Sequence, residues 1–160
     1  MQNTIASAFT RTLFTHLYPH STISINLHIL SQDGSLLAAC LNAATLALID
    51  AGVPMKDYVV ACTSGLTPPA STSGAHGGIS ETSDPLLDLN GTEEQELPFF
   101  DRGDVGGGES VSVCVMESRV QVERLEGMLA VGVDGCKQVR EILDGVVRAQ
   151  GRRVLRSVVS

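Results

Sequence analysis

The run from Leu36 to Ala51 constrains the fold more than any other feature of this chain, because it is apolar on nearly every side. Its length and its alanines are typical of a helix, and a helix without a polar face has to be covered all round. Ser35 is placed to cap the first turn, and Gly52 and Pro54 end the pattern. We therefore expect a buried helix at the centre of the fold.

Alternating apolar residues on both sides of this helix predict strands. Residues 22–30 place Ile23, Ile25, Leu27 and Ile29 on one side of an extended chain, which predicts a strand with one buried face. The run from Tyr58 to Cys62 is typical of a short interior strand, and residues 85–90 and 111–115 repeat the strand pattern.

Helical periodicity recurs at the two ends of the chain. The first helix places Ile5, Phe9, Leu13 and Leu17 on one face. A closing helix over about 123–150 has an apolar stripe made of Leu125, Met128, Leu129, Cys136, Val139, Leu143, Val146 and Val147. The predicted order is helix, strand, helix, strand, loop, two strands, helix, which is an α/β (α+β) fold in a single domain.

Between the second and third strands the composition changes. The stretch from Thr67 to Ser83 consists mainly of Pro, Ser, Thr and Gly and has almost nothing to bury, which predicts a flexible surface insertion at about 67–84. Further on, Asp101 to Gly108 is polar and glycine-rich and is expected to form a loop. Its glycines precede a strand and not a helix, so no helix N-terminus is available there to bind a phosphate.

Charge and cysteine content narrow the classes of function. A formal charge of −7 argues against a chain that holds nucleic acid by its overall electrostatics. Basic residues gather only near the end, where a solvated helix and an RNA contact explain them equally well: Arg148, Arg152, Arg153 and Arg156. No uninterrupted apolar run reaches eighteen residues, so no membrane span is expected. Four widely spaced cysteines predict buried, reduced thiols in an intracellular protein: Cys40, Cys62, Cys114 and Cys136.

One acidic cluster is a candidate for chemistry. Glu93 and Glu94, with Asp101 and Asp104, could bind a divalent cation or exchange protons. The same residues are also typical of a solvated acidic loop, and this second interpretation is favoured, so no metal site is expected. No other titratable residues fall into a recognisable catalytic motif.

Three segments together resemble the RNase PH family, specifically the eukaryotic RNA exosome ring subunits nearest to the archaeal catalytic subunit. They are LSQDGSLLAACLNAATLALIDAGVPMKDYVVAC, then PLLDLNGTEE, then RLEGMLAVGVDGCKQVREILD. The resemblance covers most of the chain outside the insertion. It implies a βαβα fold of the ribosomal protein S5 domain 2 type and a role in 3′-to-5′ RNA processing and degradation, including rRNA maturation and mRNA decay.

The same resemblance identifies the positions where activity would have to lie. Phosphorolytic members hold inorganic phosphate with a hydroxyl residue and an arginine at the start of the buried helix, and here those positions are Leu36 and Leu37. Their two catalytic aspartates correspond to Glu94 and Phe100, with Asp101 as a substitute if the loop shifts by one residue. Leucine offers neither a donor nor a charge. The prediction is a non-catalytic subunit without a cofactor, and the alternative is an active phosphate-dependent exoribonuclease that uses Mg²⁺ and releases nucleoside diphosphates.

The resemblance also implies surroundings for the chain. Expected partners are other RNase PH-like subunits in a hexameric ring, the cap subunits, and RNA passing through the assembled channel, in the nucleus, the nucleolus and the cytoplasm. Family members carry several strands and basic residues before the first helix, whereas this chain starts at Met1 within or just before that helix. We therefore expect residues 1–160 to be the C-terminal portion of one RNase PH-like domain, incomplete at its N-terminus.

Overall fold

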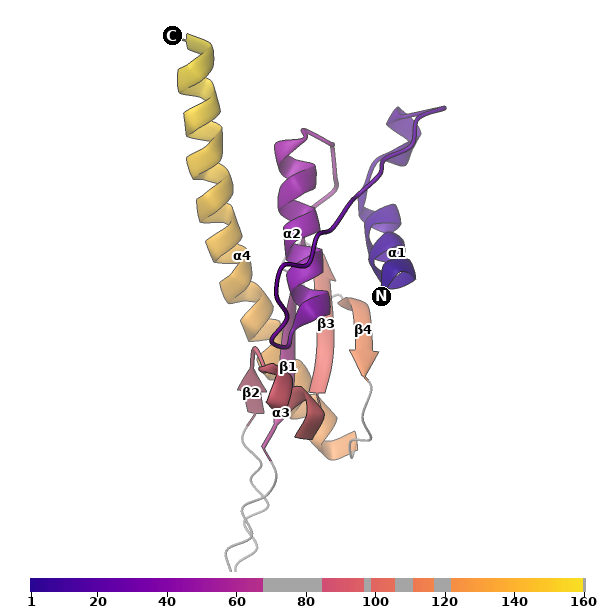
Figure 1. Cartoon of the computed structure of the whole chain (residues 1–160), viewed down its shortest axis with the longest axis vertical. Helices are drawn as coiled ribbons and strands as arrows, with labels where there is room; N and C mark the ends of the chain where they lie inside the picture. The colour runs from indigo at the N-terminus through magenta and orange to yellow at the C-terminus, as the bar shows by residue number, and fades with distance from the viewer. Residues whose placement is uncertain (68–84, 97–98, 106–110, 117–121, 160) are drawn as a thin grey trace, which may run out of the picture.

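The computed structural model describes residues 1–67, 85–96, 99–105, 111–116 and 122–159, and side chains within 1–67, 85–95, 113–116 and 125–157. Helices and strands follow one another in an order that mixes the two types throughout (Figure 1). In chain order they are α1 (Gln2–Thr12), η1 (Thr15–Leu17), α2 (Leu36–Asp50), β1 (Val59–Leu66), β2 (Pro85–Leu87), α3 (Gly91–Glu96), β3 (Phe99–Val105), β4 (Val111–Met116) and α4 (Val122–Val159). The predicted α/β class is confirmed.

The four strands form one antiparallel sheet in the order β2-β1-β3-β4. All eight residues of β1 are buried, because helices cover both faces of this strand. Val59 and Ala61 pack with α1 and α2, whereas Val60 and Cys62 pack with α4. Successive strand residues point to opposite faces, so this alternation places α1 and α2 on one side of the sheet and α4 on the other.

Helix α2 begins at the predicted residue and ends at Asp50, one residue earlier than predicted, but it is not covered all round. Leu37, Leu41 and Leu48 are buried in the core, whereas Ala39, Ala43 and Ala47 lie exposed along the opposite face. Because an alanine methyl exposes little apolar area, one bare face costs the helix little free energy. The expectation of complete burial was therefore wrong, and it failed on the smallest side chains of the run.

Two polar residues within α2 bind the edge of β1. Asn42 Nδ2 donates to Ala61 O at 2.8 Å, and Ala61 N donates to Asn42 Oδ1 at 2.9 Å. One turn further along, Thr45 Oγ1 donates to Val59 O at 2.6 Å. The sheet neighbour on this side, β2, pairs only with residues 64–66 of β1. The two side chains therefore take the place of a strand next to Val59 and Ala61.

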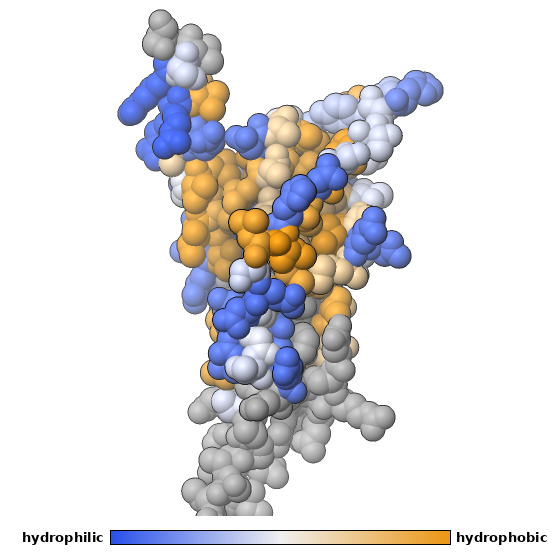
Figure 2. Space-filling view, viewed as in Figure 1, coloured by the Kyte–Doolittle hydropathy of each residue, from blue (hydrophilic) through white to orange (hydrophobic). Residues whose placement is uncertain are grey.

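The strand predicted at residues 22–30 is absent. Residues 22–30 are extended in part, but they form no β-ladder with any described strand. Ile23 and Ile25 do pack against the α1–α2 core, whereas Ile29 and Leu30 are exposed. Figure 2 shows hydrophobic side chains over the middle of the face seen. Alternation records which side chains face the core. It does not supply the partner that a strand needs.

The helix at the start of the chain is shorter than its pattern suggested. It ends at Thr12, and Leu17, the last position of the predicted face, is 55% exposed in η1. Ile5, Phe9 and Leu13 are buried as expected. The chain becomes extended at Leu13, so beyond Thr12 a spacing of four no longer brings the next residue to the same face.

The region after β2 also differs from expectation. Residues 101–105 belong to β3 and pair with β1 from Val59 to Thr63, so the predicted loop is a strand over this part. Residues 106–108 of that loop, and residues 68–84 of the predicted insertion, lie outside the described residues. The strands at β1, β2 and β4 are confirmed. Residues 101–105 are extended because they pair with β1. Since β1 is remote in sequence, the local composition of this segment could not predict the strand.

Helix α4 begins where predicted and continues to Val159. Gly135 allows it to approach the sheet, since a Cβ atom there would lie 2.9 Å from Leu87 Cδ2 and 3.0 Å from Cys62 Sγ. Val146 is 49% exposed, so the apolar stripe is narrower than expected. None of the four cysteines forms a disulfide bond, and three are buried, but Cys114 is exposed, against the prediction. No helix in the described part is long and apolar enough to cross a membrane.

Candidate functional site

The N-terminus of α2 is built on an unusual backbone turn. Gly34 and Ser35 both have positive φ angles, 86° and 51°, so the chain enters the helix through two left-handed residues. Ser35 is the N-cap residue, but its side chain forms no capping hydrogen bond. The left-handed conformation directs its hydroxyl elsewhere, and Ser35 Oγ donates to Leu89 O at 3.2 Å. Ser35 is thus the N-cap residue, as predicted, but its side chain does not make the capping hydrogen bond.

Glu94 lies against this turn. Its Oε1 atom accepts a hydrogen bond from Ser35 N at 2.6 Å, across 59 residues of sequence. The partial positive charge of the helix N-terminus favours a carboxylate at this point. The family position that resemblance assigns to a catalytic aspartate is thus occupied by a carboxylate that binds the backbone of this chain.

Helix α3 supplies Glu94 and is held by its own cap. Asn90 Oδ1 accepts hydrogen bonds from Thr92 N at 3.1 Å and Glu93 N at 3.0 Å, while Asn90 N donates to Glu93 Oε2 at 2.9 Å. This reciprocal arrangement is a capping box, with asparagine as the capping residue. Glu93 therefore binds the start of α3, whereas the less favoured interpretation of the acidic cluster, a cation site, would have used its carboxylate together with that of Glu94.

Two further contacts fix α3 to the turn before α2. Gly91 N donates to Asp33 Oδ1 at 3.2 Å. Gly34 comes so close to the Leu89–Asn90 backbone that a Cβ atom would lie 2.6 Å from Asn90 C, and closer still to Leu89 O. Because Leu89 itself is buried, this loop cannot withdraw without opening the core. The contact between Glu94 and Ser35 is therefore anchored to the core through Leu89.

Leu36 and Leu37 begin α2 directly beside this contact. Leu37 is buried in the core, and Leu36 is partly buried and packs against the same cluster. An anion at this helix end would need cationic or hydroxyl side chains to hold it in place. Both positions instead present apolar groups, and the neighbouring backbone N–H of Ser35 already serves Glu94. The described part of the site offers no clamp for inorganic phosphate.

Phe100 and Asp101 lie in β3, which the structure places next to β1. Phe100 pairs with Ser64 and Asp101 pairs with Thr63. Thr63 O also accepts a hydrogen bond from Asp88 N at 2.9 Å, so β1 connects β3 with the loop that leads to α3. The side chains of Phe100 and Asp101 are not among those that the structure describes. The substitution of Asp101 for the second catalytic aspartate therefore stays a prediction.

The described residues contain no group of three or more His, Cys, Asp or Glu side chains able to hold a metal ion. The carboxylates of Asp33, Glu93 and Glu94 each accept a hydrogen bond from a backbone N–H group. Carboxylates used in this way stabilise loops and helix ends. The arrangement is suited to holding three chain segments together.

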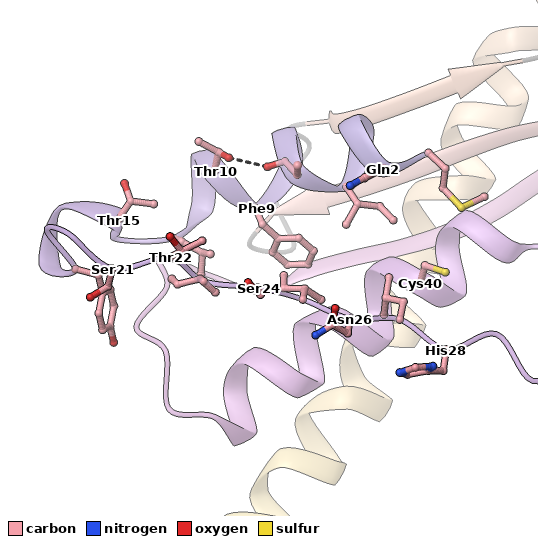
Figure 3. Close-up of a pocket in the computed structure, with 18 of the residues that line it drawn as sticks. Gln2, Phe9, Thr10, Thr15, Ser21, Thr22, Ser24, Asn26, His28 and Cys40 are labelled. Atoms are coloured by element: carbon pink, nitrogen blue, oxygen red, sulfur yellow. Dashed lines mark hydrogen bonds between the residues drawn. The ribbon is translucent and has the colours of Figure 1, made fainter.

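A separate groove lies between α1 and the extended residues 21–29, and Figure 3 shows Phe9 from α1 and Cys40 from α2 pointing into it. Its polar lining consists mainly of hydroxyl and amide groups, including Thr22, Ser24 and Asn26. Among the described residues that line it there is no carboxylate, lysine or arginine side chain. The positions that the resemblance assigns to activity lie elsewhere, at the start of α2.

We expect Glu94→Ala to lower the free energy of unfolding by about 1–3 kcal/mol, because it leaves the partly buried Ser35 N–H without its charged partner. Urea unfolding followed by circular dichroism measures this change. Glu126→Ala removes an exposed carboxylate from α4 and is the matched control, for which we expect a change within about 0.5 kcal/mol. Equal effects of the two substitutions would contradict a structural role for Glu94.

Comparison with known proteins gives the same family as the sequence motifs. Residues 1–54 match the model of the 3′ exoribonuclease family, domain 1. The chain is 33% identical to the exosome complex component SKI6 of Saccharomyces cerevisiae over 153 residues, which is 96% of this chain and 56% of that protein. It is 32% identical to the human exosome complex component RRP41 over 149 residues, or 92% of this chain and 55% of that protein.

Among solved structures, rice Rrp46 has a similar fold, with a TM-score of 0.76 and 21% identity over 91% of this chain and 63% of the rice chain. The chain spans a little over half the length of the curated relatives that it matches. The matches extend through α2, the Glu94 loop and α4, since they cover nearly all of this chain. The family model that matches residues 1–54 and the relatives that are similar over nearly all of this chain agree on the RNase PH family, and the fold is similar to that of rice Rrp46.

Proposed function

We propose that this chain serves as a non-catalytic, structural subunit of an RNA exosome ring and supports 3′-to-5′ RNA processing and degradation, including rRNA maturation and mRNA decay. One observation carries the proposal. The position where an active relative would grip phosphate is occupied by two leucines, and the adjacent N–H group is bound by Glu94. The relatives named as exosome components support the choice of complex.

Loss of phosphorolysis follows from the chemistry of this position. An attacking phosphate carries negative charge, and its binding requires donors and positive charge. Here a phosphate would meet the apolar Leu36 and Leu37 and be repelled by the carboxylate of Glu94, which already binds Ser35 N. Mg²⁺ and inorganic phosphate therefore have no assigned role in the proposed function.

The proposed partners are other RNase PH-like subunits in a hexameric ring, together with cap subunits and the RNA that passes through the assembled channel. Apolar side chains at the surface support an assembling protein: Leu17, Ile29, Leu30, Ile142 and Leu155 are each more than half exposed. Exposed apolar groups of this kind are typical of surfaces that become covered. The nucleus, the nucleolus and the cytoplasm are the proposed locations, which imaging of the tagged chain tests.

Two measurements test the proposal. We expect the purified chain to co-elute with RNase PH-like exosome subunits in size-exclusion chromatography. We also expect no release of nucleoside diphosphates when RNA is incubated with the chain, inorganic phosphate and Mg²⁺, because the phosphate position lacks donors. Glu94→Gln should leave this baseline unchanged.

The opposite result would support the alternative, an active phosphate-dependent exoribonuclease. Nucleoside diphosphates released by the chain and abolished by Glu94→Gln would show that Glu94 acts in chemistry. Retention as a monomer in the presence of the candidate subunits would contradict the structural role. Each half of the proposal can thus fail independently of the other.

A further inference from the structure

The end of α4 concentrates positive charge in an otherwise acidic chain. Residues 145–160 hold four arginines and no acidic residue, so the formal charge of −7 is the sum of +4 at this end and −11 elsewhere. Arg148, Arg152 and Arg156 follow one another at intervals of four residues, which places them on one helix face. With a rise of 1.5 Å per residue they form a row about 12 Å long. We call these three residues the arginine row.

Arg152 and Arg156 lie on the part of α4 beyond its contact with the end of α2, and Arg148 lies just before that contact. Figure 1 shows this helix reaching past the end of α2. Gln150 Nε2 still touches Asp50 Oδ1 at 3.4 Å, whereas a Cβ atom at Gly151 would meet no other atom within 4 Å. The three arginines are exposed, and Figure 2 shows hydrophilic side chains over this end. The row is therefore open to a partner on the face seen.

Contacts within the chain do not explain the arginine row. Of its members only Arg156 is in the last turn, where a cation interacts favourably with the helix dipole. The side chain of Arg148 is 77% exposed, and its Nη2 atom lies 3.9 Å from Asp144 Oδ2. No ion pair of Arg152 or Arg156 occurs among the described residues. Like charges four residues apart destabilise a helix. The row thus works against the stability of α4 and suits an external anion.

We propose that the arginine row binds the phosphate backbone of single-stranded RNA. This inference rests on the proposed function, because the exosome role is what supplies RNA as the partner. Guanidinium groups match phosphate oxygens with paired hydrogen bonds, and a regular row of them suits a regular polyanion. The acidic remainder of the chain repels RNA, which confines the contact to this end of α4.

The chemistry of the row also defines the kind of binding. Helix α4 contains no Phe, Tyr or Trp on which a base could stack. Without stacking or groups that read base edges, affinity comes from phosphate contacts alone. Binding is then independent of sequence and falls steeply with salt.

The test compares two triple variants that remove the same charge. The first changes the row to glutamine: Arg148→Gln, Arg152→Gln and Arg156→Gln. The matched control removes three exposed cations elsewhere: Arg11→Gln, Lys56→Gln and Lys137→Gln. Fluorescence anisotropy with a labelled single-stranded RNA of mixed sequence measures affinity across a salt series, and circular dichroism checks that α4 stays helical.

We expect the row variant to lose affinity by about tenfold at about 0.1 M salt and the slope of log K against log salt to become shallower by about 2, which is about 0.7 for each of three phosphate contacts. The control should change affinity by less than about threefold. Equal losses in both variants would overturn the inference, since net charge would then explain the binding. A row variant that binds RNA normally but no longer co-elutes with partner subunits would also overturn it. The arginine row would then bind acidic residues of a partner protein.

Failure of this inference is separable from failure of the proposed function. A chain that co-elutes with exosome subunits but binds RNA without the arginine row overturns the inference alone. A chain that does not co-elute contradicts the proposed function, and the anisotropy comparison still decides whether the row binds RNA. The two measurements use the same purified protein.

Discussion

Replacing Asn42 by alanine should lower the free energy of unfolding by about 2–4 kcal/mol. The substitution removes the side-chain hydrogen-bond partners of two backbone groups of a buried residue in β1. Ala61 is 2% exposed, and its N–H and C=O groups both pair with the Asn42 amide, at 2.9 Å and 2.8 Å. An alanine at this position leaves both groups without a partner at the edge of the strand. Urea unfolding measured by circular dichroism gives the change.

Two further variants identify the cause. Asn3→Ala removes an exposed asparagine from α1 and should change stability by less than about 0.5 kcal/mol. Asn42→Asp keeps an acceptor for Ala61 N but loses the donor to Ala61 O, so it should be intermediate or as damaging as alanine if its charge stays unpaired. A fully stable Asn42→Ala protein would show that the amide is not needed at this edge.

The central helix was predictable because its signal is local. Fifteen residues without a helix breaker, followed by Gly52 and Pro54, determine α2 within the segment itself. The function of its polar residues was not visible in the same way. Asn42 and Thr45 read as interruptions of an apolar run, but they bind Ala61 and Val59 across the packing interface. Their partners depend on where β1 lies, and this is a tertiary property.

Strands were harder to predict for the same reason. Residues 22–30 alternate well but find no described neighbour, whereas residues 101–105, polar and rich in Asp and Gly, form a strand because β1 and β4 lie on either side. Strand formation is decided by pairing, which periodicity within one segment does not record. The three confirmed strands are those where alternation and a neighbour coincide.

In the candidate site, too, some features could be predicted from the sequence and others depend on contacts between remote segments. Resemblance identified Leu36, Leu37 and Glu94 as the informative positions, and the structure brings all three to the start of α2. The hydrogen bond from Ser35 to Glu94 joins residues 59 positions apart, so no local sequence pattern predicts it. The cap of α3 was accessible, since an asparagine followed three residues later by glutamate is a capping signal. Its presence explains why Glu93 is unavailable for chemistry.

The turn before α2 is the other place where a small change should have a large effect. Gly34→Ala is expected to destabilise the chain by about 3–5 kcal/mol, for two reasons that add. Gly34 has a φ of 86°, which is unfavourable for any residue with a Cβ atom. The added atom would also lie 2.6 Å from Asn90 C, within a loop fixed by the buried Leu89.

Gly52→Ala separates these two reasons. Gly52 has a similar φ of 70°, but a Cβ atom there meets nothing within 4 Å, so only the backbone strain of about 1–2 kcal/mol applies. The difference between the two variants in urea unfolding therefore measures the steric contact between the α2 turn and the Leu89–Asn90 loop. If Gly34→Ala costs no more than Gly52→Ala, the loop yields freely, and Glu94 is then not held rigidly against Ser35. In that case the carboxylate can leave the helix end, and the argument that it blocks phosphate loses its structural basis.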